Sequence, residues 1–209
     1  MKEDSTSEFI RMRSGSASTP ALLTLSDEKL RAVAPELFSA RSWNKFLRDN
    51  GYRLGAPDET TEYWKNYIAD YLRCGDARAA VVMSAAPLLV AAYAGELDCV
   101  AMLRFDKKIA RVYGLGAGSR LLAINTYLEW NFWLPEDLKL GPRDSGKYRN
   151  FAPLIAEFLS NDDAAIQQQK AAIDADEWNR AQDLGREYLD QFGEKARDGR
   201  PLLCHLPAK

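Results

Sequence analysis

The residue types best suited to catalysis stand together near the C-terminus, where Cys204 precedes His205, the only histidine in the chain. A cysteine nucleophile uses a histidine as its base, and many metal sites are built from the same two residue types. Neighbours in a sequence usually point apart, however, and a nucleophile and its base normally meet through the fold. We therefore expect a docked or frayed tail here, and we predict no catalytic residue, no metal site and no cofactor.

A second pattern is the glycine-rich stretch GLGAGS at 114–119, which could suggest a phosphate-binding loop. Such loops follow a strand and precede a helix, so that the helix N-terminus faces the anion. Here the expected order is reversed, with a helix over 106–113 and a strand after the glycines. Gly114 is expected to end that helix in a left-handed conformation. A small anion- or nucleotide-binding site is kept as a lower-ranked alternative, with the residues Gly116, Gly118, Ser119 and Arg120.

Asp98, Asp106 and Lys108 have the residue types of a metal-dependent nuclease site. Two carboxylates could hold Mg²⁺ while a lysine stabilises the charge on a reacting phosphate. A strand over 98–105 would separate the carboxylates by about 26 Å, at about 3.3 Å per residue. The sequence therefore predicts solvated charges at the two ends of a strand.

The last candidate site combines aromatic and basic residues around a long connection. One interpretation is that Trp133 packs under this connection and that its basic residues are simply solvated. The other is a partner site, because Trp, Tyr and Arg are enriched at binding hot spots and an exposed aromatic beside basic residues could also hold single-stranded nucleic acid. The near-zero net charge favours a protein partner and disfavours nucleic acid. The predicted partner-binding residues are Trp133, Arg143, Lys147, Tyr148 and Arg149.

The elements that position these residues are centred on an apolar run over 79–105. A membrane span is disfavoured because the uncharged part is short and rich in alanine, and Pro87 interrupts it. Pro87 also disfavours a single buried helix, since proline removes an interior hydrogen bond. Strands remain. Gly95 and Glu96 can form a type II′ turn, which would pair Tyr93 with Asp98 in an antiparallel hairpin. The same register pairs Ala92 with Cys99 and Val90 with Ala101.

Helical periodicity surrounds this hairpin. The clearest helix precedes Gly75, where aromatic and aliphatic residues recur every fourth position from Tyr63 to Leu72. Ser26 is expected to cap an earlier helix that Pro35 interrupts. Further helices are expected from about Ser42 and over 106–113, 164–173 and 177–196. A strand over 120–133 should have a core face with Leu122 and Ile124 and a largely wet face with Asn125 and Trp133, followed by an irregular connection over 134–150.

Composition sets the outer limits of the interpretation. The chain has 209 residues, 46% of them hydrophobic, and its 28 basic and 30 acidic residues give a net charge of −2. No whole-molecule field therefore attracts nucleic acid or anionic lipid. The three cysteines are widely spaced and form no CxxC pair, so we predict neither a disulfide framework nor a zinc site, and a cytoplasmic location. The first residues lack the apolar core of a secretory signal.

The sequence predicts an α+β fold in which helices pack on a small, mainly antiparallel sheet with a central hairpin. We expect a flexible N-terminal arm over 1–24 and a single domain over 25–209, with helices at both ends and the sheet at about 80–133. The preferred function is a non-catalytic protein-interaction module, such as an adaptor, inhibitor or regulatory subunit. The partner would be another protein and not a membrane, and an oligomer is left open. An enzyme that uses Asp, Glu, Lys or Tyr chemistry without histidine is the second interpretation.

Overall fold

A computed structural model describes residues 20–39, 42, 45, 48–49, 61–129 and 134–208. In chain order the helices are α2 (Asp27–Val33), η1 (Pro35–Phe38), α4 (Thr61–Cys74), α5 (Lys107–Val112), η2 (Ala156–Phe158), α6 (Asp163–Ala172) and α7 (Ala175–Phe192). The strands are β1 (Asp76–Ala85), β2 (Leu88–Ala94), β3 (Cys99–Phe105), β4 (Arg120–Glu129), β5 (Tyr148–Ile155) and β6 (Arg197–Asp198). The expected α+β class is confirmed.

The strands form one curled, six-stranded sheet in the order β5-β4-β1-β2-β3-β6. The four pairings from β5 to β3 are antiparallel, and the short β6 adds to β3 in parallel. The sheet is therefore mixed. It also extends beyond the predicted limits of about 80–133, because β5 and β6 lie further along the chain.

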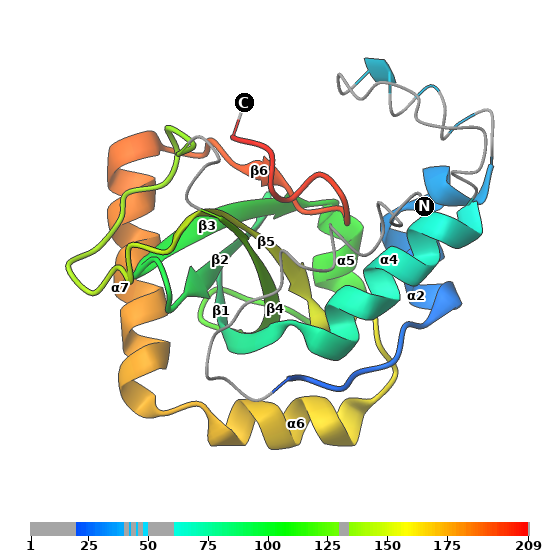
Figure 1. The fold of residues 1–209 in the computed structure, drawn as a ribbon, viewed down its shortest axis with the longest axis horizontal. Helices are drawn as coiled ribbons and strands as arrows, with labels where there is room; N and C mark the ends of the chain where they lie inside the picture. Colours follow the sequence, from blue (N-terminus) through cyan, green and yellow to red (C-terminus); the bar gives the residue numbers. More distant parts are fainter. Residues whose placement is uncertain are drawn as a thin grey trace, which may run out of the picture.

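Helices cover both faces of the sheet (Figure 1). On one face α7 packs against β1, β2 and β3. Gly185 allows this close approach, since a Cβ at that position would lie 2.8 Å from Met83 Sδ and 2.9 Å from Ala91 Cβ. On the other face the main core gathers buried side chains from α2, α4, α5 and α6, including Leu30, Leu72, Ile109 and Ile166. Both faces of the central strands are consequently apolar.

The apolar run over 79–105 forms strands, as predicted, but the register of the β2–β3 hairpin was wrong. Ala94 pairs with Cys99 and Ala92 with Ala101, so the turn has four residues instead of two. Asp98 adopts the positive φ, at 47°, and Gly95 does not. A polar residue can occupy this left-handed conformation, which removes the need for the predicted type II′ turn.

The face of β4 predicted to be wet is buried where the structure describes it. Asn125 and Tyr127 are both fully buried, because β1 and β5 flank β4 and the sheet curls around them. The predicted continuation over 130–133 lies outside the described residues. The irregular connection ends at 147, because β5 begins at Tyr148.

The predicted helices at either end of the sheet are confirmed where they can be compared. Ser26 caps α2 by accepting a hydrogen bond from the backbone N–H of Lys29, and α4, α5, α6 and α7 lie where the periodicity indicated. The helix expected from about Ser42 and residues 1–19 of the arm lie largely or wholly outside the described part of the chain. Residues 20–24, also assigned to the arm, pack here: Ala21 and Leu23 are buried, and residues 21–23 bond to the end of α4. In the described ranges, no helix has both the length and the apolar character needed to cross a bilayer.

Candidate functional site

A polar cleft of about 360 Å³ opens where the β2–β3 turn meets the first turns of α7. Its wall carries three guanidinium groups and four carboxylates around one tyrosine. The lining residues are Arg78, Tyr93, Gly95, Glu96, Arg143, Asp174, Asp176, Glu177 and Arg180. Residues from β1, β2, α7 and the 134–147 loop thus meet at one end of the sheet.

Asp98 forms the buried base of this network. It is fully buried, and it accepts hydrogen bonds from Arg180 Nε at 3.1 Å, from Arg180 Nη2 at 2.9 Å and from the Tyr93 hydroxyl at 3.1 Å. Burial alone would raise the pKa of Asp98, but the hydrogen bonds from Arg180, the Arg143 N–H and Tyr93 lower it below the ordinary value. The prediction that Asp98 is a solvated charge was therefore wrong. Asp106, at the other end of β3, is exposed and caps α5.

A second ion-pair network joins β1 to α7. Arg78 donates to Asp76 at 2.8 Å and to Glu177 at 3.2 Å, and the other Glu177 oxygen accepts the Ala79 N–H at 2.8 Å. Burial opposes the charge of Arg78, yet Asp76 and Glu177 raise its pKa. Burial also raises the pKa of Glu177, although Ala79 and Arg78 counter that effect. Both Glu177 oxygens already accept hydrogen bonds from β1, so this carboxylate has a structural role and links α7 to the sheet.

The 134–147 loop is fixed to the β2–β3 turn. Gly141 donates its N–H to Leu97 O at 3.2 Å, Ser145 donates to Glu96 O at 2.8 Å, and the Arg143 N–H reaches Asp98 Oδ2 at 3.3 Å. Only glycine fits at 141, because a Cβ there would collide with Asp98. The loop is therefore held by three backbone donors on a rigid support.

The predicted partner-binding residues separate in the structure. Arg143 and Lys147 are exposed on the 134–147 loop, and neither side chain has a hydrogen-bond or ion-pair partner among the described residues. Arg149 is partly exposed on β5. Tyr148 is buried and stacks on Tyr127 with ring centroids 5.0 Å apart, so it belongs to the core. Trp133 lies outside the described residues, and its role stays a prediction.

The groups of the lower-ranked anion site already have partners within the fold. Gly116 donates its N–H to the Ser119 hydroxyl, and Gly118 donates to Val82 O. The Arg120 guanidinium lies 4.9 Å from the centre of the Trp178 ring. These contacts make a tight turn into β4, and anion binding there stays a prediction.

The C-terminal segment is docked. Cys204 is buried, and burial raises its thiol pKa to about 12. Burial, with a further effect of Arg197, lowers the pKa of His205 to about 4. Across the described ranges, no group of three or more His, Cys, Asp or Glu side chains is placed to hold a metal ion.

Arg197, which the sequence did not single out, anchors this segment. Its guanidinium is fully buried and forms a two-pronged ion pair with Asp137, at 2.7 and 3.1 Å. It also donates to Asn150 Oδ1 at 3.0 Å and to the Phe151 and Cys204 carbonyls. One side chain on β6 therefore bridges to β5 and to the loop, across the open side of the curled sheet.

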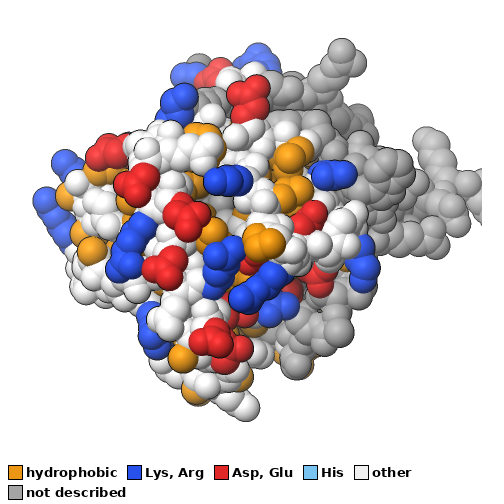
Figure 2. Space-filling view, turned by 90° about the vertical axis from the view of Figure 1, so that its left-hand side faces the viewer, with side chains coloured by type: hydrophobic (Ala, Val, Ile, Leu, Met, Phe, Trp, Pro, Cys, Tyr) orange, Lys and Arg blue, Asp and Glu red, His pale blue; other side chains and the backbone are white. Residues whose placement is uncertain are grey.

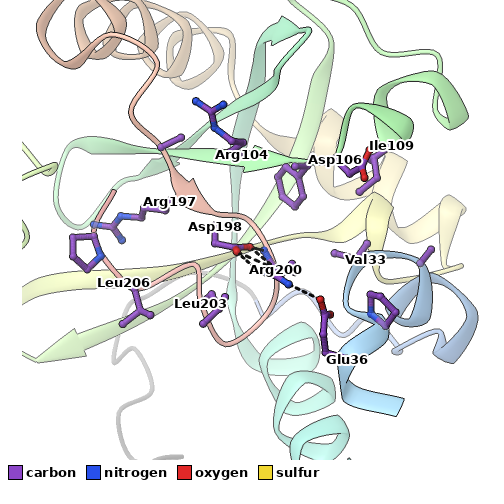
Figure 3. Close-up of a pocket in the computed structure, with 15 residues that line it drawn as sticks. Val33, Glu36, Arg104, Asp106, Ile109, Arg197, Asp198, Arg200, Leu203 and Leu206 are labelled. Carbon is purple, nitrogen blue, oxygen red and sulfur yellow. Dashed lines mark hydrogen bonds and ion pairs between the residues drawn. The ribbon is translucent and has the colours of Figure 1, made fainter. Parts of the chain in front are cut away.

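A larger edge cavity, of about 670 Å³, lies at the opposite end of β3, between α2, α5 and the C-terminal segment (Figure 3). Its apolar walls include Val33, Phe105, Ile109, Leu203 and Leu206. The charged residues that line it are Glu36, Arg104, Asp106, Arg197, Asp198 and Arg200. A volume in this range with apolar walls and a few polar groups is typical of ligand sites.

The face that carries α7 has charges of both signs. Figure 2 shows basic and acidic side chains interspersed over this side of the molecule, with hydrophobic side chains between them. A one-sign surface of the kind that follows a nucleic-acid backbone is not seen on this face.

Comparisons with protein-family models, with curated proteins and with solved structures found no match.

Proposed function

We propose that this chain is a non-catalytic protein-interaction module of the cytoplasm, which binds a partner protein through the 134–147 loop and the rim of the polar cleft. The observation that carries the proposal is that Arg143 combines a fixed backbone with an exposed side chain. Its guanidinium is exposed, it has no side-chain partner in the described part of the chain, and its backbone N–H is bound to the buried Asp98. Because the backbone at Arg143 is already fixed, a partner would have to order only the side chain and not the loop, and arginine is enriched at hot spots.

The surroundings of Arg143 favour a partner with charges of both signs. Glu96 and Asp176 line the same cleft, and no described residue pairs with either side chain. Opposite charges placed around one depression give register and specificity more than raw affinity. A partner that places an acidic side chain on Arg143 and a basic one on the cleft acids would complement this arrangement.

Charge reversal tests the proposal. The variant Arg143→Glu with Lys147→Glu should stay folded and lose partners that copurify with the tagged wild-type chain from its own cells. The matched control is Lys107→Glu with Arg111→Glu, which makes the same change of charge at exposed positions of α5. The proposal is wrong if both variants keep every copurifying protein, or if both lose the same ones.

A further inference from the structure

Three carboxylates line the edge cavity, and two of them share one guanidinium. Arg200 is shared between two carboxylates, at 2.6 Å from Glu36 Oε1 and 2.5 Å from Asp198 Oδ2. Asp106 adds a third carboxylate at the rim. Arg200 therefore pairs with two of the three acids, whereas Asp106 caps α5.

The two other arginines that line the cavity pair with none of these three acids. Arg197 is already paired with Asp137. Arg104 points away from the cavity, to the other face of β3, and donates to Glu194 O beyond the end of α7 (Figure 3). The alternation of side chains along β3 accounts for this, because Phe105 faces the cavity and its neighbour cannot.

Glu36 pairs with Arg200 through only one of its two carboxylate oxygens. Its Oε2 is buried, and among the described residues no donor reaches it. A carboxylate oxygen without a donor is costly when buried. The last torsion of a glutamate is broad, so rotation about it would bring Oε2 into the cavity and move Oε1 away from Arg200.

We propose that the edge cavity binds a lysine or arginine side chain of a partner protein, together with an apolar neighbour of that residue. The cationic head would meet Glu36, and the apolar neighbour would lie on Val33, Ile109 and Leu206. This site is distinct from the surface around Arg143, because Arg143 is bound at Asp98, next to the start of β3, and the cavity lies at Phe105, where β3 ends, about 20 Å along the strand at about 3.3 Å per residue. Asp137, at the other end of the 134–147 loop, reaches the cavity through Arg197.

The test uses two capped dipeptides, N-acetyl-leucyl-arginine amide and its citrulline counterpart, which has nearly the same shape without the charge. Titration is followed by the methyl NMR signals of Val33, Ile109, Leu203 and Leu206. We expect the arginine peptide to shift these signals and to bind at least tenfold more tightly than the citrulline peptide. Glu36→Gln should weaken the arginine peptide at least tenfold and change the citrulline peptide little.

Glu28→Gln is the matched control, because Glu28 is an exposed acid of the same helical region that does not line the cavity. It should leave both affinities unchanged, and circular dichroism should show each variant folded. Equal affinity for the two peptides, no effect of Glu36→Gln, an equal effect of Glu28→Gln, or the absence of methyl shifts would each overturn the proposal. Charge reversal at Arg143 and Lys147 should leave these titrations unchanged, so failure here is distinguishable from failure of the loop proposal.

Discussion

Replacing Asp98 by asparagine should destabilise the protein and release the 134–147 loop. Asparagine keeps the size of the side chain and tolerates the positive φ of 47°. It removes the charge that meets Arg180 at 2.9 and 3.1 Å, and it puts an amide donor where an acceptor stood. Removing one partner of a buried ion pair costs about 3–5 kcal/mol. Arg180 keeps 28% of its side chain exposed, so we expect the lower end, about 3 kcal/mol.

Equilibrium urea unfolding measures this loss as a fall in the midpoint at constant slope. Hydrogen exchange should become faster at the Arg143 and Ser145 amides. The Arg143 N–H loses the carboxylate that accepts it, and the Ser145 N–H is bonded to Glu96 O in the same β2–β3 turn, which the substitution loosens. The control is Asp183→Asn, which breaks the α7 pair with Arg186, where both side chains are 60% exposed. That pair should contribute about 0–1 kcal/mol. The reasoning would be refuted if the two variants lost equally little stability, or if exchange at the loop amides stayed the same.

Three further predictions concern the rest of the fold. Arg197→Met should cost about 3–5 kcal/mol in urea unfolding, because it leaves Asp137 buried without its partner, and a loss below about 1 kcal/mol would contradict the anchoring role. Gly185→Ala should lower stability by about 1–2 kcal/mol, since the new Cβ would press on Met83 and Ala91, whereas helix propensity alone predicts a gain; thermal unfolding gives the sign. His205 has a folded-state pKa of about 4, below the ordinary value of about 6.5. Between these values the unfolded chain binds a proton that the folded chain does not, so stability should fall by about 2–3 kcal/mol as the pH drops from 6.5 to 4. Unfolding of His205→Asn against pH should lack this part of the slope, and identical curves would rule the effect out.

The parts of the fold that were predicted correctly depend on local patterns. The stripe in α4 and the run of α7 before Gly193 are periodic over several turns, and periodicity of that length identifies a helix. The hairpin was found because Pro87 excluded the alternatives, but its register depended on turn type. The sequence is compatible with a left-handed aspartate at 98 as well as with a left-handed glycine at 95. The pattern alone could therefore not decide between a four-residue and a two-residue turn.

The parts that were missed depend on contacts between distant positions. Pro153 and the polar start of β5 disguise that strand as a loop, and proline is tolerated there because β5 is an edge strand. Asp98 looked solvated because its partner Arg180 lies 82 positions away. Arg197 gave no signal for the same reason: its ligands come from the loop, β5 and the C-terminal segment. For the candidate site, the exposure of Arg143 and Lys147 followed from the loop's polar composition, while the burial of Tyr148 did not.

Site-specific photo-crosslinking tests the central claim, that the 134–147 loop contacts a partner protein, most directly. A photoreactive amino acid at position 147 should give a discrete adduct with another protein in the cell of origin, and Arg143→Glu in the same chain should abolish it. The control position is Ala172, which is exposed at the end of α6. We predict an adduct at 147 and none at 172. No adduct at 147, or the same adduct from both positions, would contradict the account.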